Sequence, residues 1–254
     1  MSPILLHLWG PLSIHVYGLF VALGALTGIY CASKDKKIKA IMPNDEFMTF
    51  AIFIMIAAVI GGRLLFAIEM FDHLESWIDI FKFWEPGYAI LGSIAASLLL
   101  SVMYLKTYYG QIFLVLDRIA LYAPLAQSIA RLGCYFTGCC YGICTTVSWA
   151  VVYTDHNNLA PLYTLLHPTQ LYSALTLFIL FICLQLVQKM FTKPGQLAGL
   201  YLMGAALERF FVDFFRADRE LTTVMLSPAQ IVAICLFVIG LFFLYKDFYA
   251  QSNK

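Results

Sequence analysis

Charged side chains that lie within long apolar runs are the first chemical feature of this sequence. Arginine occurs in such runs at Arg63, Arg118, Arg131 and Arg209. A charge at the centre of a bilayer costs at least about 2.5–3.5 kcal/mol on insertion scales, so intramembrane charges are usually paired, hydrated or functional. The planar guanidinium group also binds phosphate through two parallel hydrogen bonds. If these runs cross a membrane, Arg63, Arg131 and Arg209 are candidates to bind a phospholipid headgroup.

Acidic residues accompany two of these arginines. Asp117 and Arg118 are adjacent, and we interpret them as an anchor with local pairing at one membrane interface. Arg209, Asp213 and Arg216 have the i, i+4, i+7 spacing of residues that share a helix face. An acid between two arginines is either a self-contained ion network or part of an anion site, and both alternatives stay open.

Four of the seven cysteines fall within eleven residues, at Cys134, Cys139, Cys140 and Cys144. In an oxidising compartment disulfides persist, and one or two disulfides are the favoured interpretation of this cluster. A zinc site is disfavoured because the spacing C-x4-C-C-x3-C lacks a paired C-x2-C, so we expect no metal and no other cofactor. A catalytic thiol whose pKa is lowered by nearby Arg131 is a further alternative.

Three more side chains near the ends of apolar runs can donate or accept a proton or a hydrogen bond: His15, Tyr17 and His167. Each also has a structural interpretation. Histidine and tyrosine are common at the membrane interface, where aromatic residues form belts. His167 precedes Pro168 and is also suited to cap the run that follows.

The composition explains why these charges are unusual. The 254 residues are 61% hydrophobic and only 12% charged, and the mean hydropathy is +0.81. Soluble domains are about 45–50% apolar and about 25% charged, so this chain has too little polar surface for a soluble globule. Its formal net charge of +1 excludes a polycationic nucleic-acid binder. The composition therefore predicts an integral membrane protein.

Seven apolar runs are long enough to cross a bilayer as helices, at about 11–32, 47–70, 86–105, 112–133, 169–188, 196–216 and 228–249. Short cytoplasmic loops are enriched in lysine and arginine. Most lysines follow the odd-numbered runs, whereas the opposite loops hold Lys82 and Arg219. The sequence therefore predicts an all-α protein of seven transmembrane helices, with the N-terminus outside and the C-terminus inside.

One membrane domain, residues 1–254, is the simplest organisation, because no repeat or hydrophilic second domain is visible. The longest connection, about 134–168, is predicted to face outward. It contains a strand-like run at 148–153 and a turn-like Asp-His-Asn-Asn at 155–158. Long ordered connections tend to be functional.

Five short segments, in order along almost the whole chain, make this sequence resemble the prolipoprotein diacylglyceryl transferase family. They are HVYGL at 15–19, GGRL at 61–64, RLG through YG at 131–142, HPTQLY at 167–172 and RF through DFFR at 209–216. The resemblance implies seven spans with the N-terminus outside. It also implies transfer of the diacylglyceryl group of phosphatidylglycerol to the lipobox cysteine thiol of a prolipoprotein, with release of glycerol phosphate.

The resemblance assigns roles to individual residues. Arg131 and Arg209 would bind the phosphate, with Arg63 as a further ligand, and Tyr17 or His15 would orient the lipid. The general base is unassigned, with His15, Asp213 and His167 as candidates. The motifs also place Gly142, Arg216 and His167 in the substrate-binding region.

Several positions depart from the family pattern. A histidine usual before the third span, often argued to be the base, is Leu91 here. The usual asparagine and glutamate after the arginine of the fourth span are Cys134 and Cys139, and a usual tyrosine is Ala205. A usual glutamate is the shorter Asp213. The phosphate-binding arginines are thus retained, while the side that would activate the acceptor has changed.

Our leading hypothesis is a phospholipid-dependent transferase in the bacterial cytoplasmic (inner) membrane, with its active site towards the outer face. The expected partners are phosphatidylglycerol or another anionic phospholipid and the signal-peptide region of a prolipoprotein, but not nucleic acid. The alternatives are a noncatalytic phospholipid- or lipoprotein-binding membrane protein and a family transferase with a different acceptor.

Overall fold

The computed structural model of the chain describes residues 3–9, 12–71, 87–222 and 225–246. The chain divides into two compact units, one formed by residues 1–32 and 116–254 and the other by residues 33–115. The single domain expected from the sequence stays a prediction. We describe each unit by itself.

The smaller unit consists of the helices α2 (Lys36–Ile41), α3 (Asn44–Glu69) and α4 (Ile90–Tyr108). Helices α3 and α4 pack closely where Gly61 faces Gly92. A Cβ atom added to Gly61 would lie 2.5 Å from the Gly92 carbonyl oxygen, so only glycine fits at this crossing. Such small residues let helix backbones approach in membranes, where dispersion contacts drive association.

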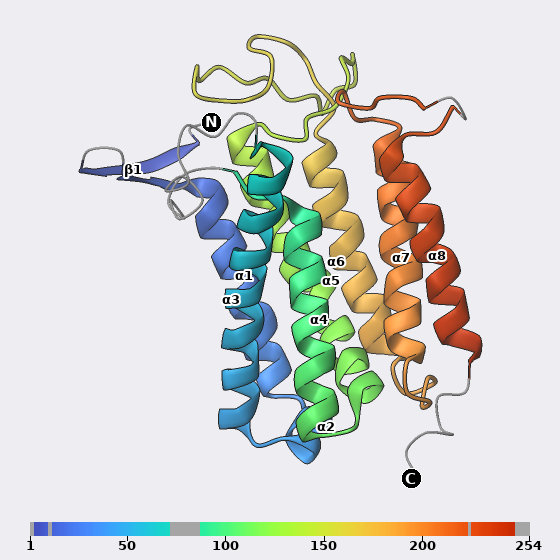
Figure 1. Cartoon of the computed structure of the whole chain (residues 1–254). Helices are drawn as coiled ribbons and strands as arrows, with labels where there is room; N and C mark the ends of the chain where they lie inside the picture. The colour runs from blue at the N-terminus through green and yellow to red at the C-terminus, as the bar shows by residue number, and fades with distance from the viewer. Residues whose placement is uncertain (1–2, 10–11, 72–86, 223–224, 247–254) are drawn as a thin grey trace. The chain divides into compact units, whose positions relative to one another are not determined.

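The larger unit contains the other helices, which are α1 (Val16–Ser33), most of α5 (Ile112–Thr137), α6 (Thr169–Val187), α7 (Gln196–Asp213) and α8 (Pro228–Tyr245). Helices α7 and α8 run side by side (Figure 1) and meet at Gly199 and Gly240. Leu121, Leu184 and Leu197 form a buried cluster that joins α5, α6 and α7. This bundle is the scaffold of the candidate site.

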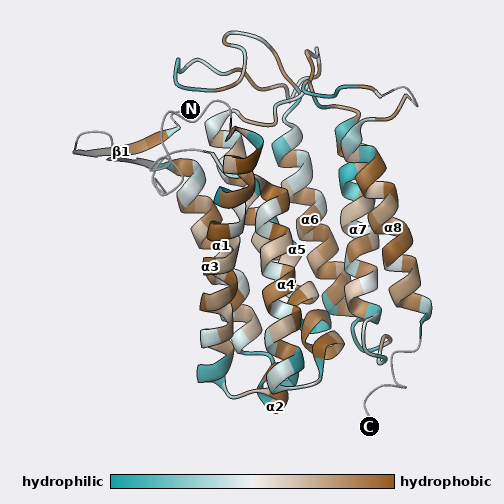
Figure 2. Ribbon diagram, viewed as in Figure 1, coloured by the Kyte–Doolittle hydropathy of each residue, from teal (hydrophilic) through white to brown (hydrophobic). Residues whose placement is uncertain are grey.

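Six of the described helices are long and apolar enough to cross a membrane, namely α1, α3, α4, α5, α6 and α8. The remaining predicted span, 196–216, corresponds to α7, which has 18 residues but carries Glu208, Arg209 and Asp213. These three charged residues lie near the C-terminal end of α7. Figure 2 shows that this end of α7 is hydrophilic, whereas α8 is hydrophobic along most of its length. The helical membrane architecture agrees with the sequence, but the count of seven stays a prediction.

Three sequence predictions about local structure were wrong. Residues 12–15 were placed in the first helix but form strand β2 (Leu12–His15), which pairs with β1 (Ile4–Trp9), so the described chain is not purely helical. The run at 196–216 ends as a helix at Asp213. The run at 148–153 makes only isolated bridges at Val151 and Tyr153, because a turn interrupts it. The predicted run ends at residues 11, 86 and 247–249 lie outside the described residues.

The connection between α5 and α6 has a hydrophobic core of its own. Tyr153, Ala160 and Leu166 are buried against one another, and the Tyr153 hydroxyl donates a hydrogen bond to the Tyr135 carbonyl oxygen at 3.0 Å. The turn predicted at 155–158 is present, since the Asn158 amide donates to the Asp155 carbonyl oxygen at 3.0 Å. The connection lies at the end of the unit where α6 and α8 begin (Figure 1), and it is therefore an ordered part of that end.

Candidate site of arginines and thiols

Three distant segments of the larger unit meet through backbone hydrogen bonds. The Gly142 amide donates to the His167 carbonyl oxygen at 3.1 Å, and the His167 amide donates to the Ile143 carbonyl oxygen at 3.0 Å. On the other side, Ile143 donates to Phe215 at 2.9 Å and Ala217 donates to Tyr141 at 3.1 Å. Gly142 and Arg216 are paired in an antiparallel bridge as a result.

Gly142 is the position where a side chain cannot be accommodated. A Cβ atom there would lie 2.5 Å from the His167 carbonyl oxygen and 2.9 Å from that of Phe215. The substrate-binding role predicted for Gly142 stays a prediction, and the structure shows that three backbones approach closely at this glycine. The junction carries Arg216 to the beginning of the connection that contains the cysteines.

Arg216 is paired with a residue that the sequence analysis did not single out. Its Nε donates to Asp218 Oδ1 at 2.8 Å and its Nη2 donates to Oδ2 at 2.5 Å. This two-point contact with Arg216 lowers the pKa of the Asp218 carboxyl. The expectation that Arg216 shares a helix face with Arg209 and Asp213 was wrong, because α7 ends at Asp213. The sequence signal for this ion pair was Asp218, an acidic residue two positions after Arg216.

Asp213 is buried at the end of α7 among several partners. Its Oδ2 accepts a hydrogen bond from the Ser227 hydroxyl at 2.5 Å, and it lies 3.6 Å from Arg219 Nε. Its Oδ1 lies 3.5 Å from Arg209 Nη2. The side chain of Asp213 is 3% exposed. These contacts tie Asp213 to Ser227 at the start of α8. A carboxyl group held by this many partners is poorly placed to act as the general base.

Arg131 and Arg209 are held much less firmly. Within the part of the chain that the structure describes, Arg131 has no hydrogen-bond or ion-pair partner, and Arg209 has the long contact with Asp213. The charges of Arg131 and Arg216, and those of the acids Asp213 and Glu208, all act on the Arg209 guanidinium. Arg216 is already paired with Asp218, whereas Arg131 has no anionic partner among the described residues, and like charges repel one another unless an anion joins them. The arrangement is suited to an anionic ligand.

Cys134, Cys139 and Cys140 converge beside these arginines. Their sulfur atoms all lie within 4.8 Å of one another, and all three are free thiols. The disulfides favoured from the sequence are not formed in this structure. Cys144, the fourth cysteine of the segment, is exposed and its backbone pairs with Leu166.

The backbone that carries the cysteines is held by α6. Thr169 Oγ1 donates to the Cys140 carbonyl oxygen at 2.7 Å, and Gln170 Nε2 donates to the Cys139 carbonyl oxygen at 2.7 Å. Gly138 and Cys140 both have positive φ, of 72° and 57°, so the chain reverses sharply after α5. Thr169 and Gln170 belong to a segment quoted in the sequence analysis, but their role in supporting the thiols was missed.

Tyr17 on α1 faces the same region. Gly133 on α5 allows the approach, because a Cβ atom there would lie 3.2 Å from the Tyr17 Cα. The Tyr17 hydroxyl interacts electrostatically with the cysteine cluster and with Arg131. Tyr17 therefore lies against α5, the helix that carries Arg131 and Cys134.

The two histidines singled out from the sequence have different surroundings. His15 is exposed at the end of β2, opposite Ile4 of β1. His167 Nδ1 lies 3.1 Å from the Tyr172 hydroxyl, which accepts a hydrogen bond from Trp149 Nε1 at 2.7 Å. The Tyr172 hydroxyl thus links Trp149 to His167. The sequence analysis did not predict that Trp149, Tyr172 and His167 form one hydrogen-bonded group.

Arg63 and Leu91 belong to the smaller unit. Arg63 is buried, donates to the Gly87 carbonyl oxygen at 2.9 Å and lies over the rings of Phe66 and Tyr88. These contacts give Arg63 a structural role at the start of α4. Leu91, the second residue of α4, is exposed.

Asp117 and Arg118 were predicted to pair locally, but the hydrogen-bond partners that hold them lie far away in the chain. Asp117 accepts backbone hydrogen bonds from Gly195 and Ala198, each at 2.7 Å. Arg118 Nη2 donates to Gln188 Oε1 at 2.9 Å. The Asp117 carboxylate thereby satisfies amides at the N-terminus of α7, where a negative charge also opposes the helix dipole.

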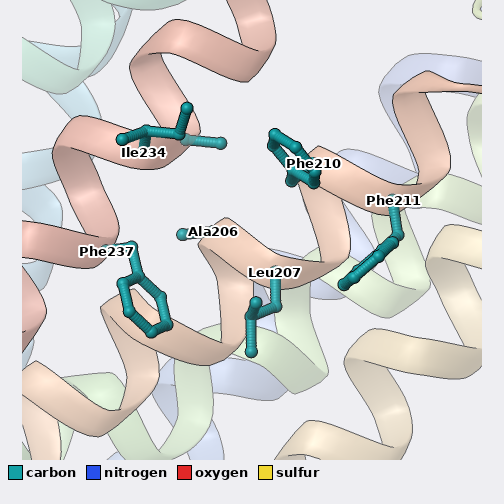
Figure 3. Close-up of a pocket in the computed structure, with 7 residues that line it drawn as sticks. Ala206, Leu207, Phe210, Phe211, Ile234 and Phe237 are labelled. Atoms are coloured by element: carbon teal, nitrogen blue, oxygen red, sulfur yellow. The ribbon is translucent and has the colours of Figure 1, made fainter.

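An apolar pocket lies between α7 and α8, next to Arg209 in sequence. It has a volume of about 220 Å³ and is lined by residues such as Ala206, Phe210 and Phe237. Figure 3 shows the side chains of Phe210, Ile234 and Phe237 around this space. No polar side chain lines it, so it is suited to a hydrocarbon chain.

The fold and site together define a helical membrane protein with clustered arginines, a thiol group and an adjoining apolar pocket. The chain matches the family model of prolipoprotein diacylglyceryl transferase over residues 3–246. It therefore belongs to the prolipoprotein diacylglyceryl transferase family, a family of transferase enzymes.

Relatives with the same designation cover almost the whole chain. A phosphatidylglycerol–prolipoprotein diacylglyceryl transferase of Clostridium tetani is 32% identical over 95% of this chain and 96% of its own. One from Clostridium botulinum strain Langeland is 31% identical over 97% of both chains. One from Oceanobacillus iheyensis is 26% identical over 92% of this chain and 84% of its own.

Proposed function

We propose that this protein transfers the diacylglyceryl group of phosphatidylglycerol to the cysteine thiol of a prolipoprotein signal-peptide region. The observation that carries the proposal is that Arg131 has no hydrogen-bond or ion-pair partner among the described residues, while its charge acts on Arg209. The names of the relatives supply the two substrates. The protein would act in the bacterial cytoplasmic membrane.

In the proposed reaction, Arg131 and Arg209 bind the phosphate of the lipid. The acceptor sulfur attacks the glycerol carbon that bears the phosphate, a carbon–sulfur bond forms and the carbon–oxygen bond breaks. Glycerol phosphate leaves with the bonding electron pair, and the thiol proton passes to His15, to His167 or to water. Cations already in place stabilise the charge that develops on the leaving phosphate without reorganisation.

The apolar pocket between α7 and α8 would take one acyl chain of the same lipid. Phe210 lines the pocket and directly follows Arg209 in the chain, so a phosphate at Arg209 and a hydrocarbon chain in the pocket fit one molecule. Tyr17, close to Arg131, would donate a hydrogen bond to the lipid. His15 and His167 remain candidates to accept a proton.

The decisive experiment uses purified protein in phosphatidylglycerol micelles with a lipobox cysteine peptide. Peptide mass and glycerol phosphate release are followed together, and both are expected to appear in a ratio of one to one. Arg131→Ala is expected to lower the rate by about 10²–10³-fold, as loss of one donor to a developing charge does.

Arg118→Gln is the control, since it removes another arginine of α5, one that is buried. Arg118 is 13 residues from Arg131, about 20 Å along a helix, and it contacts Gln188 instead. Equal activity of Arg131→Ala and the native protein would contradict the proposed phosphate site.

A binding protein without transferase activity is the second candidate. The observation that favours it is Leu91, since leucine cannot accept the proton that the usual histidine is argued to take. It predicts lipid binding that depends on Arg131 but no mass gain on the peptide. A mass gain would exclude this alternative.

We further propose that α7 crosses the membrane as a seventh span, with the N-terminus outside and the site towards the outer face. Cys144 is an exposed cysteine on the connection beside the site. A membrane-impermeant maleimide added to intact spheroplasts is expected to label Cys144, and Cys144→Ser is expected to remove that label. Labelling of Cys144 only after the membrane is permeabilised would contradict this orientation.

A further inference from the structure

Cys134 and Cys139 occupy positions that the family pattern gives to other residue types, and the structure brings their sulfur atoms together with that of Cys140. We infer that these three thiolates bind one Zn²⁺ ion and leave its fourth coordination position to the thiol of the acceptor. The assignment of the fourth position rests on the proposed function, whereas the zinc site itself does not.

The spacing of the sulfur atoms fits this inference. Zinc–sulfur bonds are about 2.3 Å long and structural zinc is tetrahedral, so bound sulfurs lie about 3.8 Å apart. The three sulfurs already lie within 4.8 Å of one another. A contraction of about 1 Å is within the reach of small side-chain rotations, so the backbone can stay as it is.

The backbone is fixed in the conformation that makes the sulfurs converge. Cys134 lies in the last turn of α5, and the chain reverses through Gly138 to reach Cys139 and Cys140. Cys140 has a φ of 57°, which is uncommon for a residue with a side chain. Hydrogen bonds from Thr169 and Gln170 to the two carbonyl groups hold this loop. Thiol ligands pre-positioned in this way lose little freedom on binding a metal.

The charge around the cluster favours an anionic metal site. Three thiolates and one Zn²⁺ carry a net charge of −1, which is costly to bury without a cation nearby. Arg131 acts electrostatically on Cys134 and Cys140, and Arg216 acts on Cys140. The arginines that would bind the lipid phosphate therefore also balance the charge of the thiolates.

The number of thiols distinguishes an open site from a closed one. Among the described residues, the group within reach of a common ion has three members, and Cys144 is exposed outside it. Structural zinc sites have four protein ligands, whereas catalytic sites have three and leave one position to water or substrate. The cluster has the ligand count of a catalytic site.

Coordination of the acceptor thiol at the open position would make a proton-accepting side chain at position 91 unnecessary, where this chain has Leu91. The acceptor thiol replaces a water molecule on zinc and releases its proton to solvent, because a thiol that coordinates zinc is deprotonated. The resulting thiolate attacks the glycerol carbon, and glycerol phosphate departs towards the arginines. No electron is transferred, and no side chain is needed as the base.

The first test measures metal in the full-length protein, purified under reducing conditions without chelator. We expect one zinc ion per chain, and its loss in Cys134→Ser, Cys139→Ser and Cys140→Ser. Cys144→Ser is the matched control and is expected to keep the ion. Cobalt in place of zinc should give the sulfur-to-metal charge-transfer band and the visible bands of tetrahedral Co²⁺. Absence of stoichiometric metal, or a disulfide between two of the three cysteines in the active protein, would overturn the inference.

The second test addresses the fourth position. A lipobox peptide is expected to shift the visible bands of the cobalt protein, and the same peptide with serine in place of cysteine is not. Identical spectra with the two peptides would overturn the assignment of the open position to the acceptor.

Chelation is expected to lower the transfer rate by at least about 10²-fold, the lower range for loss of an activating group, and added zinc to restore it. Full activity after complete removal of zinc would overturn the catalytic part of the inference. If metal and cysteine peptide both bind but no transfer occurs in any preparation, the proposed function fails while the zinc site stands.

Discussion

Asp213 and Arg209, one turn apart on α7, form an ion pair with a nitrogen–oxygen distance of 3.5 Å. The carboxylate makes a shorter contact, 2.5 Å, with the hydroxyl of Ser227. Long ion pairs contribute little, whereas buried hydrogen bonds to a charged group contribute about 1.5–3 kcal/mol. Asp213 therefore stabilises the junction of α7 and α8 and leaves Arg209 available to a ligand.

The first prediction follows from this division of roles. Asp213→Asn is expected to lower the free energy of unfolding by about 1–3 kcal/mol, because a buried charged acceptor is lost. The transfer rate should fall less than about tenfold, since loss of a general base would cost about 10²–10⁴-fold. Thermal unfolding and the peptide assay measure the two effects. Asp45→Asn, on an exposed residue of α3, is the control; a rate loss of more than about 10²-fold with unchanged stability would make Asp213 the base.

The second prediction concerns the junction at Gly142. Gly142→Ala is expected to destabilise the protein by about 1–3 kcal/mol, because the added methyl group overlaps the His167 carbonyl oxygen and the backbone must shift. The shift should also move Arg216 and reduce transfer. Gly18→Ala is the matched control, since nothing lies within 4 Å of a Cβ atom there. Native stability of Gly142→Ala would refute the account of the junction.

The third prediction tests the hydrogen-bonded chain of Trp149, Tyr172 and His167. Tyr172→Phe removes the hydroxyl that joins the two rings, and we expect a loss of about 0.5–1.5 kcal/mol of stability. If His167 takes the proton of the acceptor, the variant should also change the pH profile of transfer, because the partner of Nδ1 is lost. Tyr163→Phe, on an exposed tyrosine of the same connection, is the control. An unchanged pH profile with lowered stability would assign the chain a structural role.

The fourth prediction concerns the other end of α7. Asp117→Asn is expected to cost about 1–3 kcal/mol, because two backbone amides lose a charged acceptor. Asn keeps one acceptor oxygen, so Asp117→Ala should cost more. Transfer at a temperature where the variant is folded should be unchanged. A selective loss of activity would show that this end of the helix takes part in the reaction.

Much of the architecture is predictable because it depends on local composition. Long apolar runs need a bilayer, and a helix satisfies its own backbone hydrogen bonds there. The positions of six spans therefore agree with the structure, whereas the partners of Asp117 and Arg118 lie about 70–80 residues away in the chain. The start of the first helix was missed because the apolar residues 12–15 can equally pair as a strand.

The candidate site is different, because its contacts join segments that are far apart in the chain. Periodicity alone placed Arg216 on a helix beside Asp213, but the helix ends and Arg216 binds Asp218. The spacing of the cysteines along the chain argued against a metal site, because it lacks the C-x2-C pair of common zinc motifs. The reversal at Gly138, which Thr169 and Gln170 hold, brings the sulfurs together instead.

The sequence by itself determined that the chain lies in a membrane, which charged residues need a partner or a function there, and which family the motifs indicate. These properties follow from residue types and their order, which act through transfer free energies and local hydrogen bonds. Tertiary structure alone decided that Gly142 serves a backbone junction, that Asp213 is shared with Ser227 and that the three thiols face one another. Those relationships depend on where distant backbones cross, and no local pattern encodes that crossing.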